Sequence, residues 1–371
     1  MAKTALITID GAYCKVKNGL ITIDGTYNKI KKALITIGGV YRPCWSGDGE
    51  KLEYYGTATP LSAGRQELAA TRVGNYALFG GGHSNAGASA RVDAYNPSLT
   101  RTTASDLGTA RTRLAATSVG DYALFASSVV DVYDKSLTLS KADNLVTEKY
   151  CLAATSVGDY ALFGGGMPNF SAYGPSSEVD AYNKSLTRTI PEKLTNGRTS
   201  LAATKVGNYA LFGGGSGSDG ALATVDAYDK SLTHSICEEL LEARYELAAA
   251  KVGDYAVFGG GYDGRDCLGP VSAYDKSLTR IIPAEGFVMV TGLASTSVGD
   301  YALFGGGQEQ GHPTDMVYAY DKSLTRTTPT ALNKARYYLA ATSVAGYALF
   351  GGGTTGSISD TADTVDVYTL A

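Results

Sequence analysis

Several kinds of side chain are scarce in this chain, and each scarcity excludes a class of chemistry. Its three histidines lie far apart in the sequence and leave few ligands for a metal ion. The five cysteines are odd in number and none forms a Cys-x-x-Cys pair, a pattern typical of reduced thiols rather than of disulfides or a zinc site. We therefore expect neither a metal nor another cofactor.

Excess positive charge and long apolar runs are lacking too. The formal net charge is −4, so the sequence predicts no nucleic-acid binding through phosphate neutralisation. No segment approaches the roughly 18 apolar residues that a membrane span needs. A secretory signal is not recognisable at the start, which reads MAKTALITIDGAY. We expect a protein that is made in the cytoplasm and does not insert into membranes.

Glycine (46 residues) and tyrosine (26 residues) are abundant, and they are arranged in a repeat. A phrase that reads Gly-Asp/Asn-Tyr-Ala-Leu-Phe-Gly-Gly-Gly recurs with small changes, and its tyrosines are Tyr76, Tyr122, Tyr160, Tyr209, Tyr255, Tyr301 and Tyr347. A strand of small residues precedes each copy, and a strand like Val-Asp-Ala-Tyr follows it. A fourth strand like Leu-Thr-Arg-Thr follows in all copies but the last. Four short strands repeated in this way predict an all-β fold, a seven-bladed β-propeller.

The last copy ends at its third strand, Val365 to Tyr368. A spare segment of the fourth kind stands before the first copy, at Leu52 to Thr57. We expect this N-terminal strand to complete the seventh blade and close the ring, because closure removes free sheet edges.

Three features recur inside the copies. A glycine pair closes the second strand in six of them, as at Gly164-Gly165, and a tyrosine lies on every third strand, as at Tyr182. An arginine precedes the first strand in five copies, at Arg65, Arg111, Arg198, Arg244 and Arg336. In these features residues 52–371 resemble the kelch repeat. The family's tryptophan is absent from the fourth strand, and the second copy has Ala126-Ser127-Ser128 in place of the glycines. The resemblance implies a kelch-like propeller and leaves the function open.

Residues 1–48 form a separate module ahead of the propeller, which we place at residues 49–371. A shorter repeat starts at Leu6, Leu20 and Leu34, and Asp-Gly or Gly-Gly pairs follow, which favour two-residue hairpin turns. The pattern predicts three successive hairpins, a small antiparallel sheet. The segment also resembles glycine-punctuated repeats of prophage tail and minor structural proteins, which implies attachment to an assembly or self-association. A sheet docked on the propeller is the alternative.

Variation among the seven copies is confined to two connections. The loop between the second and third strands changes in length and composition, and so does the composition of the segment between copies, whereas the other two turns are nearly uniform. In an up-and-down blade these two variable connections lie on one face. Loops on a rigid scaffold often carry recognition residues, so we expect this face to bind a ligand. Neutral drift in exposed loops is the alternative.

The candidate ligand-binding residues on this face are mostly aromatic or cationic, as at binding hot spots. They are His83, Arg111, Arg113, Tyr150, Phe170, Arg198, Arg244, Tyr245, Tyr262, Arg265, Arg336, Tyr337 and Tyr338. The repeated arginines have a structural alternative, as struts between blades.

Enzymatic chemistry finds little support in the sequence. The kelch-like fold also occurs in copper radical oxidases, but the histidines of this chain do not converge, and no Ser-x-Asp-x-Gly-x-x-Trp sialidase motif is present. We expect a non-enzymatic binding protein, associated with a phage tail or virion, that recognises a receptor glycan or protein. The alternatives are a cytosolic kelch-type interaction scaffold and a propeller enzyme acting on carbohydrate, because a catalytic carboxylate pair needs only spatial proximity.

Overall fold

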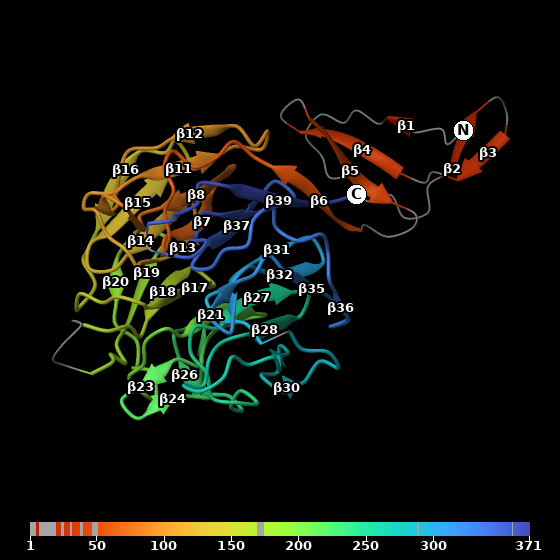
Figure 1. Cartoon of the computed structure of the whole chain (residues 1–371). Helices are drawn as coiled ribbons and strands as arrows, with labels where there is room; N and C mark the ends of the chain where they lie inside the picture. Colours follow the sequence, from red (N-terminus) through yellow and green to blue (C-terminus); the bar gives the residue numbers. More distant parts are fainter. Residues whose placement is uncertain are drawn as a thin grey trace.

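The computed structural model describes five short N-terminal strands and residues 51–168, 174–287, 289–357 and 359–371. All regular secondary structure in this part of the chain is β-strand. Seven four-stranded antiparallel sheets follow one another around a ring (Figure 1). The prediction of an all-β, seven-bladed propeller is confirmed.

Each blade runs from an innermost strand at the central channel to an outermost strand, and its strands are named in that order. Blade 1 contains β7 (Ala69–Val73), β8 (Tyr76–Gly80), β11 (Val92–Tyr95) and β12 (Arg101–Thr103), and blade 2 contains β13 (Ala115–Val119), β14 (Tyr122–Ala126), β15 (Val130–Asp134) and β16 (Leu139–Ala142). Blade 3 contains β17 (Ala153–Val157), β18 (Tyr160–Gly164), β19 (Val179–Asn183) and β20 (Arg188–Thr189), and blade 4 contains β21 (Ala202–Val206), β22 (Tyr209–Gly213), β25 (Val225–Asp229) and β26 (His234–Ile236). Blade 5 contains β27 (Ala248–Val252), β28 (Tyr255–Gly259), β29 (Ser272–Tyr274) and β30 (Arg280–Ile281), and blade 6 contains β31 (Ala294–Val298), β32 (Tyr301–Gly305), β35 (Val317–Asp321) and β36 (Arg326–Thr327). Blade 7 contains β37 (Ala340–Val344), β38 (Tyr347–Gly351), β39 (Val365–Leu370) and β6 (Leu52–Thr57).

In the described part of the chain, short hairpins extend the loops between the second and third strands of three blades. They are β9 (His83–Ser84) with β10 (Gly87–Ala88), β23 (Ser216–Gly217) with β24 (Gly220–Ala221), and β33 (Gln308–Glu309) with β34 (His312–Pro313).

Blade 7 combines both ends of the propeller. Strand β6 runs antiparallel to β39, from Leu52 opposite Leu370 to Thr57 opposite Asp366, with a bulge between Val367 and Tyr368. Tyr54 of β6 packs edge-on against Tyr368, with the ring centroids 5.3 Å apart, and its hydroxyl donates to Asp366 at 2.7 Å. The strand that follows the N-terminal segment is therefore the outermost strand of the last blade.

The N-terminal strands form two hairpins and one parallel pair. Strands β2 (Leu20–Ile23) and β3 (Thr26–Lys29) pair antiparallel, as do β4 (Lys32–Ile37) and β5 (Val40–Ser46). Strand β1 (Ala5–Leu6) runs parallel to β4. The remainder of the first predicted hairpin lies outside the described residues.

The innermost strands alternate between two environments. In β7, Ala69, Thr71 and Val73 are buried inside the blade, whereas Ala70 and Arg72 are more exposed and face the central channel. This period of two repeats in the other inner strands, which contact their neighbours around the ring. The first channel-facing position of each inner strand holds a small residue, as at Ala70, which lets seven strands approach a common axis.

Glycine at the end of the second strand makes room for the neighbouring blade. A Cβ atom on Gly80 would lie 2.7 Å from the ring of Phe125, and one on Gly213 would lie 2.8 Å from the ring of Phe258. In most blades the phenylalanine thus packs onto the glycine of the preceding blade, so the repeated glycine serves the packing between blades.

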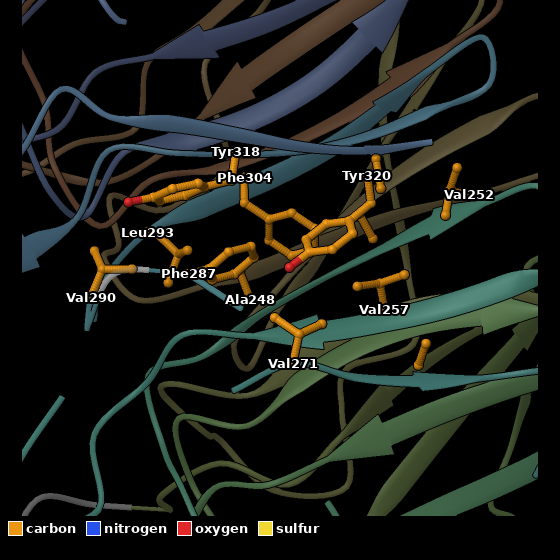
Figure 2. Close-up of a cluster of buried hydrophobic side chains, with 13 residues drawn as sticks. Ala248, Val252, Val257, Val271, Phe287, Val290, Leu293, Phe304, Tyr318 and Tyr320 are labelled. Carbon is orange, nitrogen blue, oxygen red and sulfur yellow. The ribbon is translucent and has the colours of Figure 1, made fainter. Parts of the chain in front are cut away.

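Between blades 5 and 6 another aromatic residue takes over this position. Phe287, from the segment that joins the two blades, stacks on Tyr318 at 5.0 Å and lies 4.9 Å from Phe304 (Figure 2). Val271, Val290 and Leu293 belong to the same buried cluster. This cluster contains more aromatic residues than any other of the seven hydrophobic clusters among the described residues.

Candidate functional site

A closed circle of backbone hydrogen bonds surrounds one mouth of the central channel. In each blade, the residue two positions before the innermost strand donates its amide to the carbonyl of the corresponding residue in the preceding blade, as Arg113 does to Glu67. The seven N–O distances lie between 2.9 and 3.2 Å. We call these residues the inner ring: Glu67, Arg113, Cys151, Ser200, Glu246, Gly292 and Tyr338.

The inner ring has one backbone conformation and seven side-chain environments. All seven residues have positive φ, between 53° and 65°, although six of them are not glycine. Residues other than glycine seldom adopt a backbone conformation with positive φ, and here the closed circle of hydrogen bonds stabilises that conformation. Because only backbone atoms form the circle, the side chains can differ without breaking it.

The inner ring lines a cavity of about 330 Å³, which we call the central cup. The other lining residues are the leucines that follow each inner-ring residue, and each leucine is 7 or 8% exposed. They are Leu68, Leu114, Leu152, Leu201, Leu247, Leu293 and Leu339. The cup therefore offers an apolar lining beneath a rim of charged, polar and aromatic groups, a combination typical of ligand pockets.

Two carboxylates occupy different parts of the rim, and both are hydrogen-bonded. Glu67 accepts from the Arg113 guanidinium at 2.7 Å and from the Thr112 hydroxyl at 2.8 Å. Glu246 accepts from the Tyr338 hydroxyl at 3.3 Å. Burial raises the pKa of the Tyr338 phenol, and the Glu246 carboxylate raises it further, so this hydroxyl is a neutral donor.

Cys151 is the one thiol of the inner ring. Burial raises its pKa, and the nearby Arg113 charge offsets only part of that effect. A thiol with a raised pKa is protonated at neutral pH and is a poor nucleophile. Its place in the ring favours contact with a ligand over covalent chemistry.

A second circle of residues surrounds the first. In six of the seven blades, within the described residues, the residue before the inner-ring position forms a β-bridge. Its partner is the residue that starts the loop between the second and third strands. We call these pairs the outer ring: Gln66 with His83, Tyr150 with Met167, Thr199 with Ser216, Tyr245 with Tyr262, Thr291 with Gln308, and Tyr337 with Thr354. Both variable connections thus meet on one side of the propeller, which we call the loop face.

Aromatic residues concentrate on the part of the loop face that belongs to blades 5 and 7. The rings of Tyr245 and Tyr262 meet edge to face, 5.6 Å apart, and those of Tyr337 and Tyr338 lie 4.9 Å apart. Tyrosine pairs offer large contact area together with hydroxyl donors, which suits recognition of a polar ligand.

The structure brings most of the predicted site residues together. Arg113 and Tyr338 belong to the inner ring, and His83, Tyr150, Tyr245, Tyr262 and Tyr337 belong to the outer ring. Arg265 lies farther out, in a separate cavity of about 620 Å³ that Asp219 and Glu242 also line. Phe170 lies outside the described residues.

Four predicted contacts have another role. Arg111 is 6% exposed, and Arg198, Arg244 and Arg336 are at most 2% exposed. The Arg198 guanidinium donates to Asp226 of the third strand at 2.5 Å and to the Phe212 carbonyl at 3.0 Å. We therefore do not retain these arginines as ligand contacts.

In five blades, a buried pair joins the connection before the blade to that blade's own third strand. It recurs as Arg65 with Asp93, Arg111 with Asp131, Lys149 with Asp180, Arg198 with Asp226, and Arg336 with Asp366. In blade 5, Arg244 donates instead to the carbonyls of Gly260 and Pro270. The expected contact between blades is made by the backbone of the arginine instead. Its carbonyl oxygen accepts a hydrogen bond from the amide of a glycine in the preceding blade, as Arg198 does from Gly166.

The face opposite the loop face, which we call the turn face, carries turns whose sequences are nearly the same in all blades, and this uniformity has a structural reason. The Lys135 stem packs on Gly74 of the preceding blade, where a Cβ atom would lie 3.0 Å from it. Its ammonium pairs with Asp121 of its own blade at 2.6 Å. Corresponding pairs join Lys184 to Asp159, Lys276 to Asp254 and Lys322 to Asp300. These repeated turns are part of the contact between blades.

Five inner-ring residues were not predicted from the sequence: Glu67, Cys151, Ser200, Glu246 and Gly292. The signal was the position immediately before the leucine of each copy, where the residues are Glu, Arg, Cys, Ser, Glu, Gly and Tyr. A variable position next to a repeated one indicates a fixed backbone with an interchangeable side chain.

The described residues contain no group of three or more His, Cys, Asp or Glu side chains that could hold a metal ion. Nor do they include a helix that is long and apolar enough to span a bilayer. No protein-family model matches the chain, and a comparison with curated proteins finds no match either, so its function has to be argued from the central cup and the loop face.

Proposed function

We propose that this protein is a non-enzymatic binding protein that recognises a glycan or a protein segment at the central cup and the outer ring. The inner ring carries this proposal, because seven blades hold one backbone geometry while presenting Glu, Arg, Cys, Ser, Glu, Gly and Tyr. A scaffold that keeps its backbone and varies its side chains at one mouth is suited to recognition.

The chemistry of the rim favours a carbohydrate. Tyrosine rings such as Tyr262 and Tyr337 can pack on the apolar faces of sugars, while Glu67 and Glu246 can accept hydrogen bonds from sugar hydroxyls. The apolar leucines beneath them suit the ring carbons of a sugar unit that enters the cup.

We further propose that the propeller is of kelch type and serves as a receptor-binding or accessory protein of a phage tail or similar virion-associated assembly. Support comes from the repeat motifs and from the resemblance of residues 1–48 to repeats of prophage tail proteins. Residues 1–48 are the proposed attachment point.

Deletion of residues 1–48 is expected to leave a folded, monomeric propeller that no longer joins its assembly. Strand β6 begins at Leu52 and is retained in this variant, so blade 7 stays complete. Circular dichroism and co-sedimentation with the assembly would measure folding and attachment. Normal incorporation of the truncated protein would refute the attachment role.

Replacing Arg113, Tyr262 and Tyr338 together with serine is expected to abolish ligand binding with little change in folding. Blade 4 already has serine at these positions, Ser200 and Ser216, so the backbone tolerates the change. Loss of recognition hot spots should weaken binding by about 2 kcal/mol or more. A glycan array, followed by titration of the glycan that binds, would measure this.

The matched control lies on the turn face, where Asp121 and Asp254 would be replaced by asparagine, the residue that blades 1 and 4 have at Asn75 and Asn208. Exposed ion pairs contribute about 0–1 kcal/mol, so this control should fold and bind normally. Binding lost only in the control would move the site to the turn face. Capture of one protein partner with no glycan binding would instead favour an interaction scaffold, and turnover of a bound glycan would favour an enzyme.

A further inference from the structure

The central channel is lined by a second set of residues, which are not part of the proposed binding site at the cup. Each innermost strand turns two side chains toward the channel, and the second of them lies near the turn face. We call these seven residues the channel ring: Arg72, Ser118, Ser156, Lys205, Lys251, Ser297 and Ser343. Every member is a hydrogen-bond donor, three are cationic, and none is acidic.

The three cations approach one another from opposite walls. Blades 4 and 5 are neighbours and supply Lys205 and Lys251, whereas Arg72 belongs to blade 1, three blades away from each of them around the ring. Protein encloses Lys205 and lowers its pKa by desolvation, and the charges of Lys251 and Arg72 lower it further. All three cations line the same part of the channel, and the charges of Lys251 and Arg72 both act on Lys205.

No carboxylate offsets this charge among the described residues that line this part of the channel, a cavity of about 260 Å³. The turns next to Arg72 and Lys205 hold the neutral residues Asn75 and Asn208, and the turn next to Lys251 holds Asp254, which pairs with Lys276 at 2.6 Å. Lys205 donates to the Ser156 hydroxyl at 3.2 Å, a neutral partner. Three positive charges thus converge without a counter-charge.

The side chains are also accessible to a solute. Arg72, Lys205 and Lys251 are exposed to the water of the channel even though protein surrounds them. Next to them along the strands the channel-facing residues are small, alanine in six blades and Ser295 in blade 6, so nothing bulky competes for the space.

We propose that the channel ring is a binding site for a tetrahedral oxyanion, either phosphate or the phosphate group of a monoester. A dianion would offset most of the converging charge, and its oxygens would accept hydrogen bonds from the two lysines and the arginine. Charge-assisted hydrogen bonds of this kind are the strong ones, and lysine and arginine are the usual partners of phosphate. The site is independent of ligand recognition at the cup.

The seven-fold design of the chain supplies the test. Four blades already have serine in the channel ring, so a variant with Arg72→Ser, Lys205→Ser and Lys251→Ser keeps the backbone and removes only the charge. The control replaces three exposed lysines outside the channel, Lys141, Lys230 and Lys334, with serine and changes the net charge equally. Each protein would be titrated calorimetrically in a phosphate-free buffer with inorganic phosphate and, separately, with glycerol phosphate.

We expect the wild-type protein and the control to bind phosphate and to gain thermal stability from it. Each cation removed singly from the channel ring should weaken binding by at least about tenfold, and the triple variant should bind neither probe. In the absence of phosphate, the triple variant should melt at a higher temperature than the wild type, because the repulsion is gone. Tighter binding of the monoester would identify an ester as the natural source, and tighter binding of the free ion would identify phosphate itself.

Two results would overturn the proposal. One is that neither probe binds the wild-type protein or raises its melting temperature at millimolar concentration. The other is that the triple serine variant binds phosphate as tightly as the control does, which would place the anion elsewhere on the surface.

Discussion

Removal of residues 1–57 is expected to lower the free energy of unfolding by about 5 kcal/mol, because about 1 kcal/mol is lost for each of the five residue pairings between β6 and β39. The deletion also exposes the edge of β39 and the ring of Tyr368, which Tyr54 covers. An unpaired edge promotes association with another chain, so we expect the variant to form oligomers. Urea unfolding and size-exclusion chromatography would measure both effects.

The truncation at residue 48 is the natural control, because it removes the N-terminal module and leaves β6 in place. A difference between the two truncated proteins isolates the contribution of one strand. If both unfolded at the same urea concentration, β6 would not be a stabilising part of the ring.

Replacement of Asp226 by asparagine is expected to destabilise the protein by about 3–5 kcal/mol, because it leaves the buried guanidinium of Arg198 without its counter-charge. Both side chains of this pair are fully buried. Thermal or urea unfolding, followed by circular dichroism, would measure the loss. Binding at the cup should persist in the folded fraction, because neither side chain of the pair lines the cup.

Arg198→Lys is the matched control, because blade 3 holds Asp180 with Lys149 at 3.2 Å. This variant should lose clearly less stability than Asp226→Asn. Equal losses in the two variants would show that hydrogen-bond geometry, and not charge, determines the contribution of the pair.

The same pair makes stability depend on pH. Burial would raise the pKa of Asp226, but Arg198 and hydrogen bonds from Thr195 and His234 hold it below its usual value. The stabilisation is therefore complete above the unfolded pKa of about 3.9 and is lost as the pH falls through the lower, folded value. Asp226→Asn should flatten this part of the acid unfolding curve, and an unchanged curve would contradict the assignment.

The propeller is predictable because one strong signal repeats. Alternation of buried and channel-facing residues, as in Ala69 to Val73, identifies the innermost strands, and the glycines at the end of the second strands mark the contact between blades. The alternation and the glycines both indicate the same blade structure in every copy, so small departures such as Ala126 in blade 2 do not obscure the pattern.

A structural role of the repeated arginines was one of the two alternatives, but their aspartate partner was not identified, although charged residues are seldom fully buried without one. The partner was present in the sequence, as the aspartate of each Val-Asp-Ala-Tyr strand. In blade 6 both members are replaced, with Val290 and Tyr318 packed against Phe287 where other blades have the ion pair (Figure 2). In blade 5 only the aspartate is replaced, by Ser272, and Arg244 donates to backbone carbonyls instead.

The candidate site was predicted in outline only. Tyr337 and Tyr338 stand out as neighbouring aromatic residues in a variable connection, and the structure places both at the mouth of the channel. Glu67 and Glu246 did not stand out, because sequence propensity does not predict a left-handed conformation for glutamate. That conformation follows from the circle of hydrogen bonds, which joins residues far apart in the chain.

The hydrogen-bond circle also bears on how such a protein can change. Every blade donates to its predecessor and accepts from its successor through the same backbone atoms, so the blades are interchangeable parts with respect to the inner ring. Unequal recombination between the near-identical repeats would carry a blade, together with its rim residue and its loop, to another position without disturbing its neighbours. Recombination can therefore change the order of the inner-ring residues around the mouth of the channel faster than point mutation alone would permit. The identity of the ligand that is bound there would change with it.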